Sequence, residues 1–553
     1  MNATRLLNGA RRFTTTTTVR KKMSRQARVS QQIAAAKSLA EVDVLGLGVD
    51  NRAYQVESTI RNSDLPLHSF DVVTSSTALH RLARYSSTST DLLQPTVDRL
   101  AQLLEGVCGP SGRVMSNALW SCARLSDCVD LSQLLNVVTS AILSLPFDAF
   151  ESLHIANCLW ACATLSDSVQ DPGQLLSVVS HLTEALVSRS PTAFSEQNVS
   201  NILWSLGALE SVRLPPSILL HMAALAQHHL TKGTAGTQSQ ANGVWGLAKL
   251  LQTAEEQDSI TDIENQQVRR VVENVALQRI SLWSANGAHV RPEELGMVVW
   301  SLAATLNGAV DPHHKSLMKL SALIRSKAEA LVAADNGGDG RLISNILWSF
   351  ASLRYWDENL DHFLLAAKSL LTSSKIRLSC RNACASVWAL AVLDLPVFPG
   401  LLHSAINSCF STSPEPRAVV ALMIGIAAST KRPSLPAEQL HRLFDRARDA
   451  LTEEHLAPTV ASQLFTVQMW GMSCLSRPYY WPEAILRMSV EAGVHGLPSD
   501  GRIVSDMQSG VGDALQRLLK GRTKLLVEPT ARRIGWNVDF GLGGELGVEW
   551  IAT

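Results

Sequence analysis

The sequence predicts an all-α protein, an α-solenoid of about ten helix-turn-helix repeats of ~40 residues, followed by a small α/β module. Two observations carry this prediction. A short motif centred on tryptophan recurs along the chain, with 36 to 55 residues between successive copies. Self-similarity at this period is the signature of stacked helical repeats. The pattern then changes after Pro498, where glycines and short apolar runs replace the motif.

The motif is clearest in residues 117–125 (NALWSCARL), and it returns in residues 157–165 (NCLWACATL) and 201–209 (NILWSLGAL). We number each copy from its central residue, position 0, and call the helix that it predicts the signature helix. Position 0 falls at His80, Trp120, Trp160, Trp204, Trp245, Trp300, Trp348, Trp388, Ile424 and Trp470.

On a helical wheel, apolar or small residues occupy positions −1, 0, +2, +3 and +5, which together cover roughly 220°. So wide an arc predicts a helix that packs between neighbours on both sides. We therefore interpret the tryptophan as a core residue that fills the space between layers, rather than as a platform for base stacking. Small residues at +2 or +3 would let the next helix approach closely.

Positions −3, +1 and +4 form the remaining strip, and small hydrogen-bonding residues recur there with an occasional cation; the copies at Trp300 and Trp388 depart from this pattern. Two interpretations remain open. The polar side chains could satisfy backbone groups or cap helices, or each repeat could offer side chains to one nucleotide, as helical-repeat RNA-binding proteins do. The candidate RNA-binding residues are Arg81, Arg84, Asn117, Ser121, Arg124, Asn157, Asn201, Ser205, Asn242, Lys249, Asn345 and Ser349.

The N-terminal residues 1–40 contain nine Lys or Arg, no Asp or Glu, and a run of threonines from Thr14 to Thr18. This composition predicts a disordered mitochondrial targeting segment, with a plastid transit peptide as the alternative. A basic tail that binds nucleic acid is the competing interpretation. Residues 41–70 are expected to form an irregular lead-in, and no apolar run in the chain reaches the roughly 18 residues that cross a bilayer.

The repeats are expected to occupy residues 71–490, and polar insertions such as residues 255–267 explain the longer intervals between copies. Residues 500–553 are expected to form the α/β module. There, residues 507–519 predict an amphipathic helix, and residues 524–528, 535–540 and 546–550 predict three strands. A glycine-rich turn is expected to join the last two strands.

The charge and the cysteine content argue against two classes of function, nonspecific binding of polyanions and metal binding. After residue 40 the chain holds 40 basic and 49 acidic residues, a net charge of −9, which disfavours a nonspecific polyanion binder. Nine cysteines include no CxxC pair, and several occupy small-residue positions of the signature helix, as expected in a reducing compartment. The pairs Cys158/Cys162 and Cys380/Cys384 lie five repeats apart, so we expect no zinc site, no other metal and no cofactor.

The repeated Leu-Trp-Ser-Leu-Ala-type helices resemble the octotricopeptide repeats of organelle RNA-binding proteins and the related repeats of the FAST-kinase-like family. Residues 505–550 resemble the opening half of a RAP domain, through Gln508, Leu515, Val527-Glu528, Gly535 to Asp539 and Val548-Glu549. The resemblance implies an endonuclease-like fold with Asp539 and Glu549 as an acidic pair. However, Glu549 is followed by Trp550-Ile551, so the lysine of a D…ExK constellation is missing, and we expect no nuclease activity.

Together these observations predict a non-enzymatic RNA-binding protein of the mitochondrial matrix. The expected partner is single-stranded organellar mRNA or rRNA, and the expected role is RNA stability, RNA processing or ribosome assembly. Mitoribosomal or RNA-processing proteins are further candidate partners. The alternative is a helical-repeat scaffold that binds the proteins of an organellar complex, and a third, weaker hypothesis is RNA cleavage by the terminal module.

Overall fold

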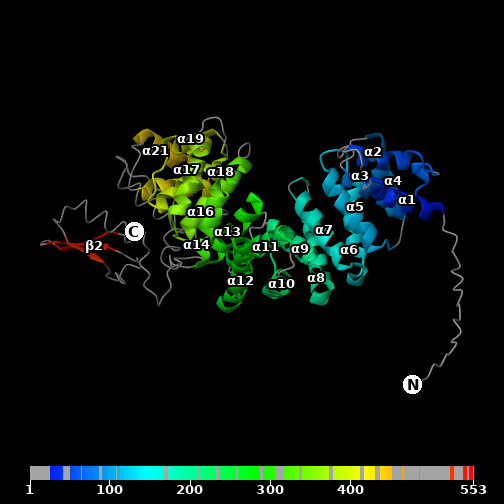
Figure 1. Ribbon diagram of the computed structural model, residues 1–553, viewed down its shortest axis with the longest axis horizontal. Coiled ribbons are helices and arrows are strands. Elements are labelled where there is room, and N and C mark those ends of the chain that lie inside the picture. Colours follow the sequence, from blue (N-terminus) through cyan, green and yellow to red (C-terminus); the bar gives the residue numbers. More distant parts are fainter. Residues whose placement is uncertain are drawn as a thin grey trace, which may run out of the picture. The chain divides into compact units, whose positions relative to one another are not determined.

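A computed structural model describes residues 25–40 and 50–450, the isolated positions 464, 467, 482 and 485, and the strand segments 524–527, 540–544 and 547–551. Within 50–450 the undescribed residues are 64, 86–89, 107–108, 167, 170–171, 210–211, 232–235, 257–258, 287–289, 307–314, 336–338, 373–377, 412–415 and 430–435. The described part of 25–450 is helical, which confirms the predicted all-α array (Figure 1). The chain divides into two compact units, residues 1–186 and 187–553.

In the first unit the signature helices α3, α5 and α7 pack side by side, and α4 packs against α6 in a second row (Figure 1). Short 3₁₀ turns join some of these helices. The helices are α1 (Arg25–Ala40), α2 (Asp50–Arg61), α3 (Val72–Arg84), α4 (Thr90–Gly106), α5 (Gly112–Leu125), α6 (Ser132–Ser144), α7 (Ser152–Leu165) and α8 (Pro172–Val187).

The second unit repeats this arrangement. Its signature helices α9, α11, α13, α16, α18 and α20 contact one another in that order, and the partner helices form a second row. The first part comprises α9 (Glu196–Ala208), α10 (Pro216–Leu230), α11 (Thr237–Glu256), α12 (Asp262–Asn286), α13 (Pro292–Leu306), α14 (Lys315–Ser326) and α15 (Ala328–Asp335). The second part comprises α16 (Arg341–Ser352), α17 (Glu358–Thr372), α18 (Cys380–Val392), α19 (Pro399–Ser411), α20 (Pro416–Ala428) and α21 (Ala437–Ala450).

The signature helices begin at a recurring capping position, nine residues before position 0. Asp71 caps α3 by accepting a hydrogen bond from the Thr74 amide (2.8 Å), and Ser195 caps α9 by accepting one from the Asn198 amide (3.2 Å). Ser111 and Ser379 cap α5 and α18 in the same way. A side-chain oxygen at this place satisfies a backbone donor that the helix itself leaves open. In these four helices the cap therefore sets where the signature helix starts.

Adjacent signature helices touch through their backbones at position +1. A Cβ atom on Gly246 would lie 2.2 Å from the Leu203 carbonyl oxygen, and one on Gly425 would lie 2.9 Å from the Trp388 Cα. Real Cβ atoms are excluded at such distances by van der Waals repulsion. In α11 and α20 a small residue at +1 is therefore required by the packing of that helix on the backbone of the preceding signature helix.

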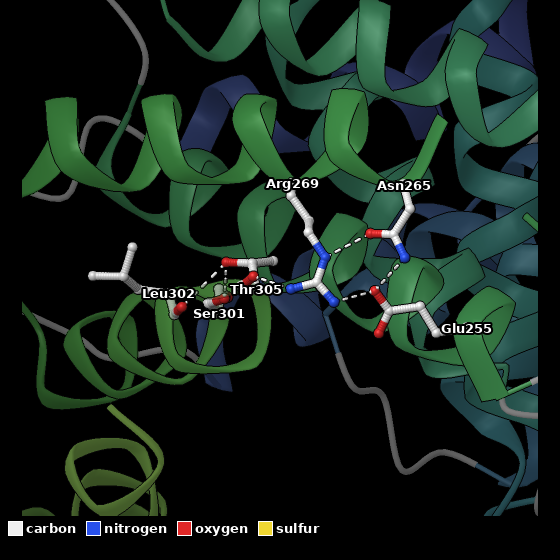
Figure 2. A network of polar contacts seen from close by, with 6 residues as sticks. All are labelled: Glu255, Asn265, Arg269, Ser301, Leu302 and Thr305. Carbon is white, nitrogen blue, oxygen red and sulfur yellow. Dashed lines mark hydrogen bonds and ion pairs between the residues drawn. The ribbon is translucent and has the colours of Figure 1, made fainter. Parts of the chain in front are cut away.

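A network of polar contacts connects α11, α12 and α13 of the second unit (Figure 2). The Arg269 guanidinium on α12 donates to Glu255 at the end of α11 (2.5 Å), to Asn265 (2.5 Å) and to the Thr305 carbonyl near the end of α13. Glu255 also accepts from the Asn265 amide (2.8 Å). The sequence predicted residues 255–267 as an insertion between repeats. Glu255 of this segment lies at the end of α11 and Asn265 at the beginning of α12, and their hydrogen bond ties these two helices together, while Arg269 adds the connection to α13.

The N-terminal segment 1–40 was predicted to be disordered, but its described part is helical. Residues 25–40 form α1, which contacts α2 and α3, and its Val29 and Ile33 are 1% and 0% exposed. The Gln26 side chain donates to the Ser69 carbonyl (2.7 Å). The lead-in was predicted to be irregular, but its residues 50–61 form α2. A basic segment without acids can still fold when neighbouring helices cover its apolar side.

At the C-terminal end three strands form an antiparallel sheet in the order β1–β2–β3. They are β1 (Lys524–Val527), β2 (Phe540–Gly544) and β3 (Gly547–Ile551). The prediction of a glycine-rich turn is wrong for residues 541–544, which belong to β2: residues 541–543 pair with both neighbouring strands and Gly544 pairs with β3, because an extended backbone tolerates glycine. The predicted helix 507–519, residues 535–539 of the predicted second strand and the copy at Trp470 lie outside the described residues.

Candidate nucleic-acid interface

A ridge of exposed and half-buried side chains runs along the signature helices of each unit. Positions −3, 0 and +4 form it, and they lie within about 60° on a helical wheel. In the first unit its residues are Thr77, His80, Arg84, Asn117, Trp120, Arg124, Asn157, Trp160 and Thr164. In the second unit they are Asn201, Trp204, Ala208, Asn242, Trp245, Lys249, Met297, Trp300, Ala304, Asn345, Trp348, Ser352, Ala385, Trp388 and Val392.

The aromatic rings at position 0 form a ladder from repeat to repeat. In the first unit the ring centroids of His80 and Trp120 lie 4.9 Å apart, and those of Trp120 and Trp160 lie 5.9 Å apart. In the second unit Trp245 to Trp300 is 6.3 Å and Trp300 to Trp348 is 6.2 Å. These are distances of direct aromatic contact. The interpretation of the tryptophans as core residues is therefore half right, because the indoles of these pairs pack on one another and are also only half-buried.

An asparagine stands beside most of these rings. The side chains of Asn117, Asn157, Asn201, Asn242 and Asn345 at position −3 are half-buried. No hydrogen bond within the described residues engages their side-chain amides, although the backbone carbonyls of three of them accept bonds. An asparagine amide supplies two donors and an acceptor. Each of these repeats thus presents an available amide next to an indole.

The predicted serines at position +1 do not belong to the ridge. Ser121, Ser205 and Ser349 are buried, and each hydroxyl donates to the backbone carbonyl four residues earlier at 2.6 Å. This back-bonding satisfies the hydroxyl inside its own helix. For the serines, the interpretation that polar side chains satisfy backbone groups is therefore correct. They are small because the preceding helix packs on position +1. They cannot reach a ligand without breaking these contacts.

Four predicted cations lie at or next to the ladder. Arg84 and Arg124 are exposed, and Arg81 and Lys249 are half-buried. The Arg124 guanidinium lies 6.0 Å from the Trp120 ring centroid, and the Lys249 ammonium lies 5.1 Å from that of Trp300. These are cation–π distances. Arg124 and Lys249 are therefore held over aromatic faces of the ladder.

Position −7 also belongs to the ridge, although the sequence pattern did not lead us to predict it. It falls on the same 60° arc, about two turns before position 0. Arg113, Arg341 and Arg381 occupy it and are exposed. Val73 and Leu153 occupy the same position in α3 and α7, with 50% and 53% exposure. The seven-residue spacing from position 0 was available in the sequence and could have identified this position.

In the first unit, the pKa of His80 shows the effect of the positive charges around it. Burial first, and then the positive charges of Arg81, Arg84 and Arg113, lower the pKa of His80 from 6.5 to about 4. His80 is therefore neutral near pH 7, so it continues the aromatic ladder without adding charge. The three arginines around it make this end of the ridge favourable for anions.

No family model matches this chain, and no curated protein matches it significantly. Within the described residues, no helix is long and apolar enough to span a membrane. Of the acidic pair implied by the resemblance, Asp539 lies outside the described residues, and the backbone of Glu549 in β3 pairs with Leu542 in β2. The arrangement at the ridge can bind a flat aromatic group together with an anion.

Proposed function

We propose that this protein binds single-stranded RNA along the ridge of its signature helices and acts in RNA stability, RNA processing or ribosome assembly. The observation that carries the proposal is the recurring group of a half-exposed indole, an available asparagine amide and a nearby cation. Proteins that recognise single-stranded RNA stack bases on aromatic side chains and bond the base edges. The three chemical groups of the ridge match the base face, the base edge and the phosphate.

The ladder limits how the RNA would lie. Neighbouring rings are in contact, so a base would stack on the exposed part of the ridge rather than between two tryptophans. Asparagine amides would bond base edges, and Arg84, Arg124 and Lys249 would contact phosphates. With one nucleotide near each repeat, the expected footprint on cellular RNA is about ten nucleotides.

The affinity and salt dependence of RNA binding test this proposal. We would titrate the full-length protein into labelled single-stranded RNA at several KCl concentrations and measure fluorescence anisotropy. The triple variant Arg84→Gln/Arg124→Gln/Lys249→Gln should bind at least about tenfold more weakly, and its log–log salt slope should fall by about 2, since each phosphate contact on a single strand contributes about 0.7.

The matched control removes three exposed cations that lie away from the ridge, as Arg213→Gln/Lys315→Gln/Lys319→Gln. It has the same change in net charge and should keep the wild-type affinity and slope. Equal behaviour of the ridge and control variants would refute the proposed interface. Asn157→Ala/Asn201→Ala should reduce discrimination between RNA sequences by about fivefold or more per residue, the lower end for an amide–base contact.

A second candidate, a scaffold for proteins, is favoured by a different observation. Val73 and Leu153 are apolar and half exposed at position −7, beside the ridge of the first unit, and the chain after residue 40 is acidic overall. Exposed apolar side chains that line up on one face suit a protein partner. Crosslinking in cells separates the two candidates: discrete organellar RNA footprints support RNA binding, and recovery of proteins without RNA supports the scaffold.

The location and the C-terminal module complete the proposal. We place the protein in the mitochondrial matrix, with plastids as the alternative, because six Lys or Arg and no acid occur in residues 1–24. The strands β1–β3 are proposed to belong to an α/β module similar to a RAP domain. We propose that this module does not cleave RNA, because the lysine after Glu549 is missing. Any RNA cleavage by the purified protein that Asp539→Ala abolishes would contradict this.

A further inference from the structure

Three cysteines of the second unit meet where α18 begins. Cys380 is the first residue of α18, Cys384 lies one turn further on, and Cys409 comes from α19. The Sγ atoms of Cys380 and Cys409 are 3.3 Å apart, those of Cys384 and Cys409 are 3.6 Å apart, and those of Cys380 and Cys384 are 4.0 Å apart. None of the three forms a disulfide. The cluster thus presents three sulfur atoms to one point.

The cluster is shielded but reachable. Cys384 and Cys409 are fully buried, whereas Cys380 is half-buried at the start of its helix. Hydrogen bonding to the Cys380 thiol, together with burial, raises the pKa of Cys384 well above its usual value and that of Cys409 to about 12. Without a bound ion the buried sulfurs are therefore protonated thiols, and a ligand would enter past Cys380.

We propose that Cys380, Cys384 and Cys409 bind one copper(I) ion in a three-coordinate thiolate site. An ion about 2.3 Å from each sulfur would hold the three sulfurs about 4 Å apart when it lies in their plane. One sulfur pair already has this separation. The other two both involve Cys409 and must open by less than 1 Å, which a small rotation of the Cys409 side chain can supply.

The donor set selects the ion. Thiolate ligands favour soft ions such as copper(I) and zinc(II), but zinc in structural sites takes four ligands in a tetrahedron. Within the described residues no histidine nitrogen or carboxylate oxygen joins the three sulfurs. Copper(I) is satisfied by three sulfur ligands, so it fits the cluster better than zinc does.

Each thiol that binds the ion releases its proton to solvent, so coordination creates negative charge at the site. Two features of the structure offset this charge. Cys380 lies in the first turn of α18, where the helix dipole favours a thiolate. Arg446 of α21 donates from Nε to the Cys409 carbonyl at 3.2 Å, which places a guanidinium beside the third ligand. The bound ion would connect α18 to α19.

The first unit holds a natural comparison. Cys158 and Cys162 of α7 are also buried one helical turn apart, and they do not form a three-ligand group with any described residue. Cys162→Ala therefore removes a buried cysteine of similar helical setting without touching the proposed site. This site does not depend on RNA binding, and its test does not measure RNA.

The test is a competition for copper(I) under anaerobic, reducing conditions. The full-length protein is titrated with copper(I) in the presence of a chromophoric copper(I) chelator. Wild type and Cys162→Ala should each retain one copper equivalent, with X-ray absorption showing three sulfur neighbours and with a raised melting midpoint. Cys384→Ala and Cys409→Ala should bind at least 100-fold more weakly while retaining wild-type helical circular dichroism.

Three results would overturn the proposal. Wild-type protein that retains no copper equivalent would show that the cluster is only a packing feature. Undiminished binding by both Cys384→Ala and Cys409→Ala would place any copper elsewhere. One equivalent of zinc(II) held in preference to copper(I) would show that the site has a fourth ligand and a different ion.

Discussion

In a signature helix, the positions that are buried differ from those that the helical wheel predicted. Position +1 was expected at the surface, but Ser121 and Gly246 are buried there because the preceding helix rests on them. Position 0 was expected in the core, but Trp120 is half-buried and contacts the next indole. The exposed strip is therefore shifted by about 40° toward position 0. This shift converts a row of structural tryptophans into an accessible aromatic surface.

The first prediction concerns His80. Its folded pKa of about 4 lies below its unfolded value of 6.5, so the unfolded chain binds the proton more readily between these values. Stability of the first unit is therefore full above pH 6.5 and decreases as the pH falls toward 4. We expect His80 to account for a loss of about 2 kcal/mol between pH 7 and 5, which His80→Gln should remove.

Urea denaturation of the two proteins at a series of pH values measures this effect. His68→Gln, which removes an exposed histidine of the same unit, is the matched control and should retain the wild-type pH dependence. A wild-type slope in His80→Gln would show that other groups cause the acid sensitivity.

At the scale of helices, the repeats depend on a cap at the start and close backbone contact in the middle. Ser111 and Ser195 recur at the cap position, and the glycines at +1 allow the close contact. In the second unit Arg269 adds a connection from α12 to the ends of α11 and α13. Its ion pair with Glu255 is only about a quarter exposed, so water screens it less than it screens a surface pair.

The second prediction tests the contact between α9 and α11. In Gly246→Ala the new Cβ atom would meet the Leu203 carbonyl oxygen at 2.2 Å, so the two helices must separate. We expect the second unit to lose about 2–4 kcal/mol of unfolding free energy, as overpacked cores do. Gly106→Ala at the end of α4 has no atom within 4 Å of its Cβ and is the control.

Thermal melting followed by circular dichroism provides the measurement. The control should be neutral or slightly stabilising, because alanine restricts the unfolded chain more than glycine does. If Gly246→Ala melted at the wild-type temperature, the close approach of α9 and α11 at this residue would be wrong.

At the scale of the whole molecule, charge and order are distributed unevenly along the chain. The N-terminal 40 residues are basic and the remainder is acidic, while the arginines around His80 form a local positive region in the first unit. A local basic site on an acidic chain favours selective over nonspecific binding of polyanions. The first unit also includes α1, which extends the helical array ahead of the repeats.

The third prediction concerns this N-terminal helix. Removing residues 1–24 should leave the stability of the first unit unchanged, whereas removing residues 1–40 deletes the buried Val29 and Ile33 and the bond from Gln26 to Ser69. We expect the longer deletion to lower the melting midpoint of this unit by about 5 °C or more. An equal midpoint for the two deletions would show that α1 does not stabilise the unit.

The same helix limits where a targeting segment would be cleaved. If the chain is imported into mitochondria, the mature protein should start at or before Arg25, so that α1 is retained. N-terminal sequencing of the protein from the organelle identifies the cleavage site. A mature N-terminus within residues 27–40 would contradict this boundary.

The sequence alone determined the helical repeats, their period and most of the ridge. These features were readable because the helical period and the caps are local, and because each repeat packs mainly on its neighbours. Asn117, Trp120 and Arg124 could thus be placed on one helix from spacing alone. The sequence also identified the paired cysteines of α18 but not their third partner.

Only the tertiary structure decided which edge of each helix is covered. The preceding helix buries position +1 and leaves position 0 half open, and sequence spacing does not contain that contact geometry. The structure likewise brought Cys409 to Cys380 and Cys384 and packed α1 onto α3, because both depend on which helices lie side by side. Local patterns determine helices, whereas the surface and the clusters arise from the packing between helices.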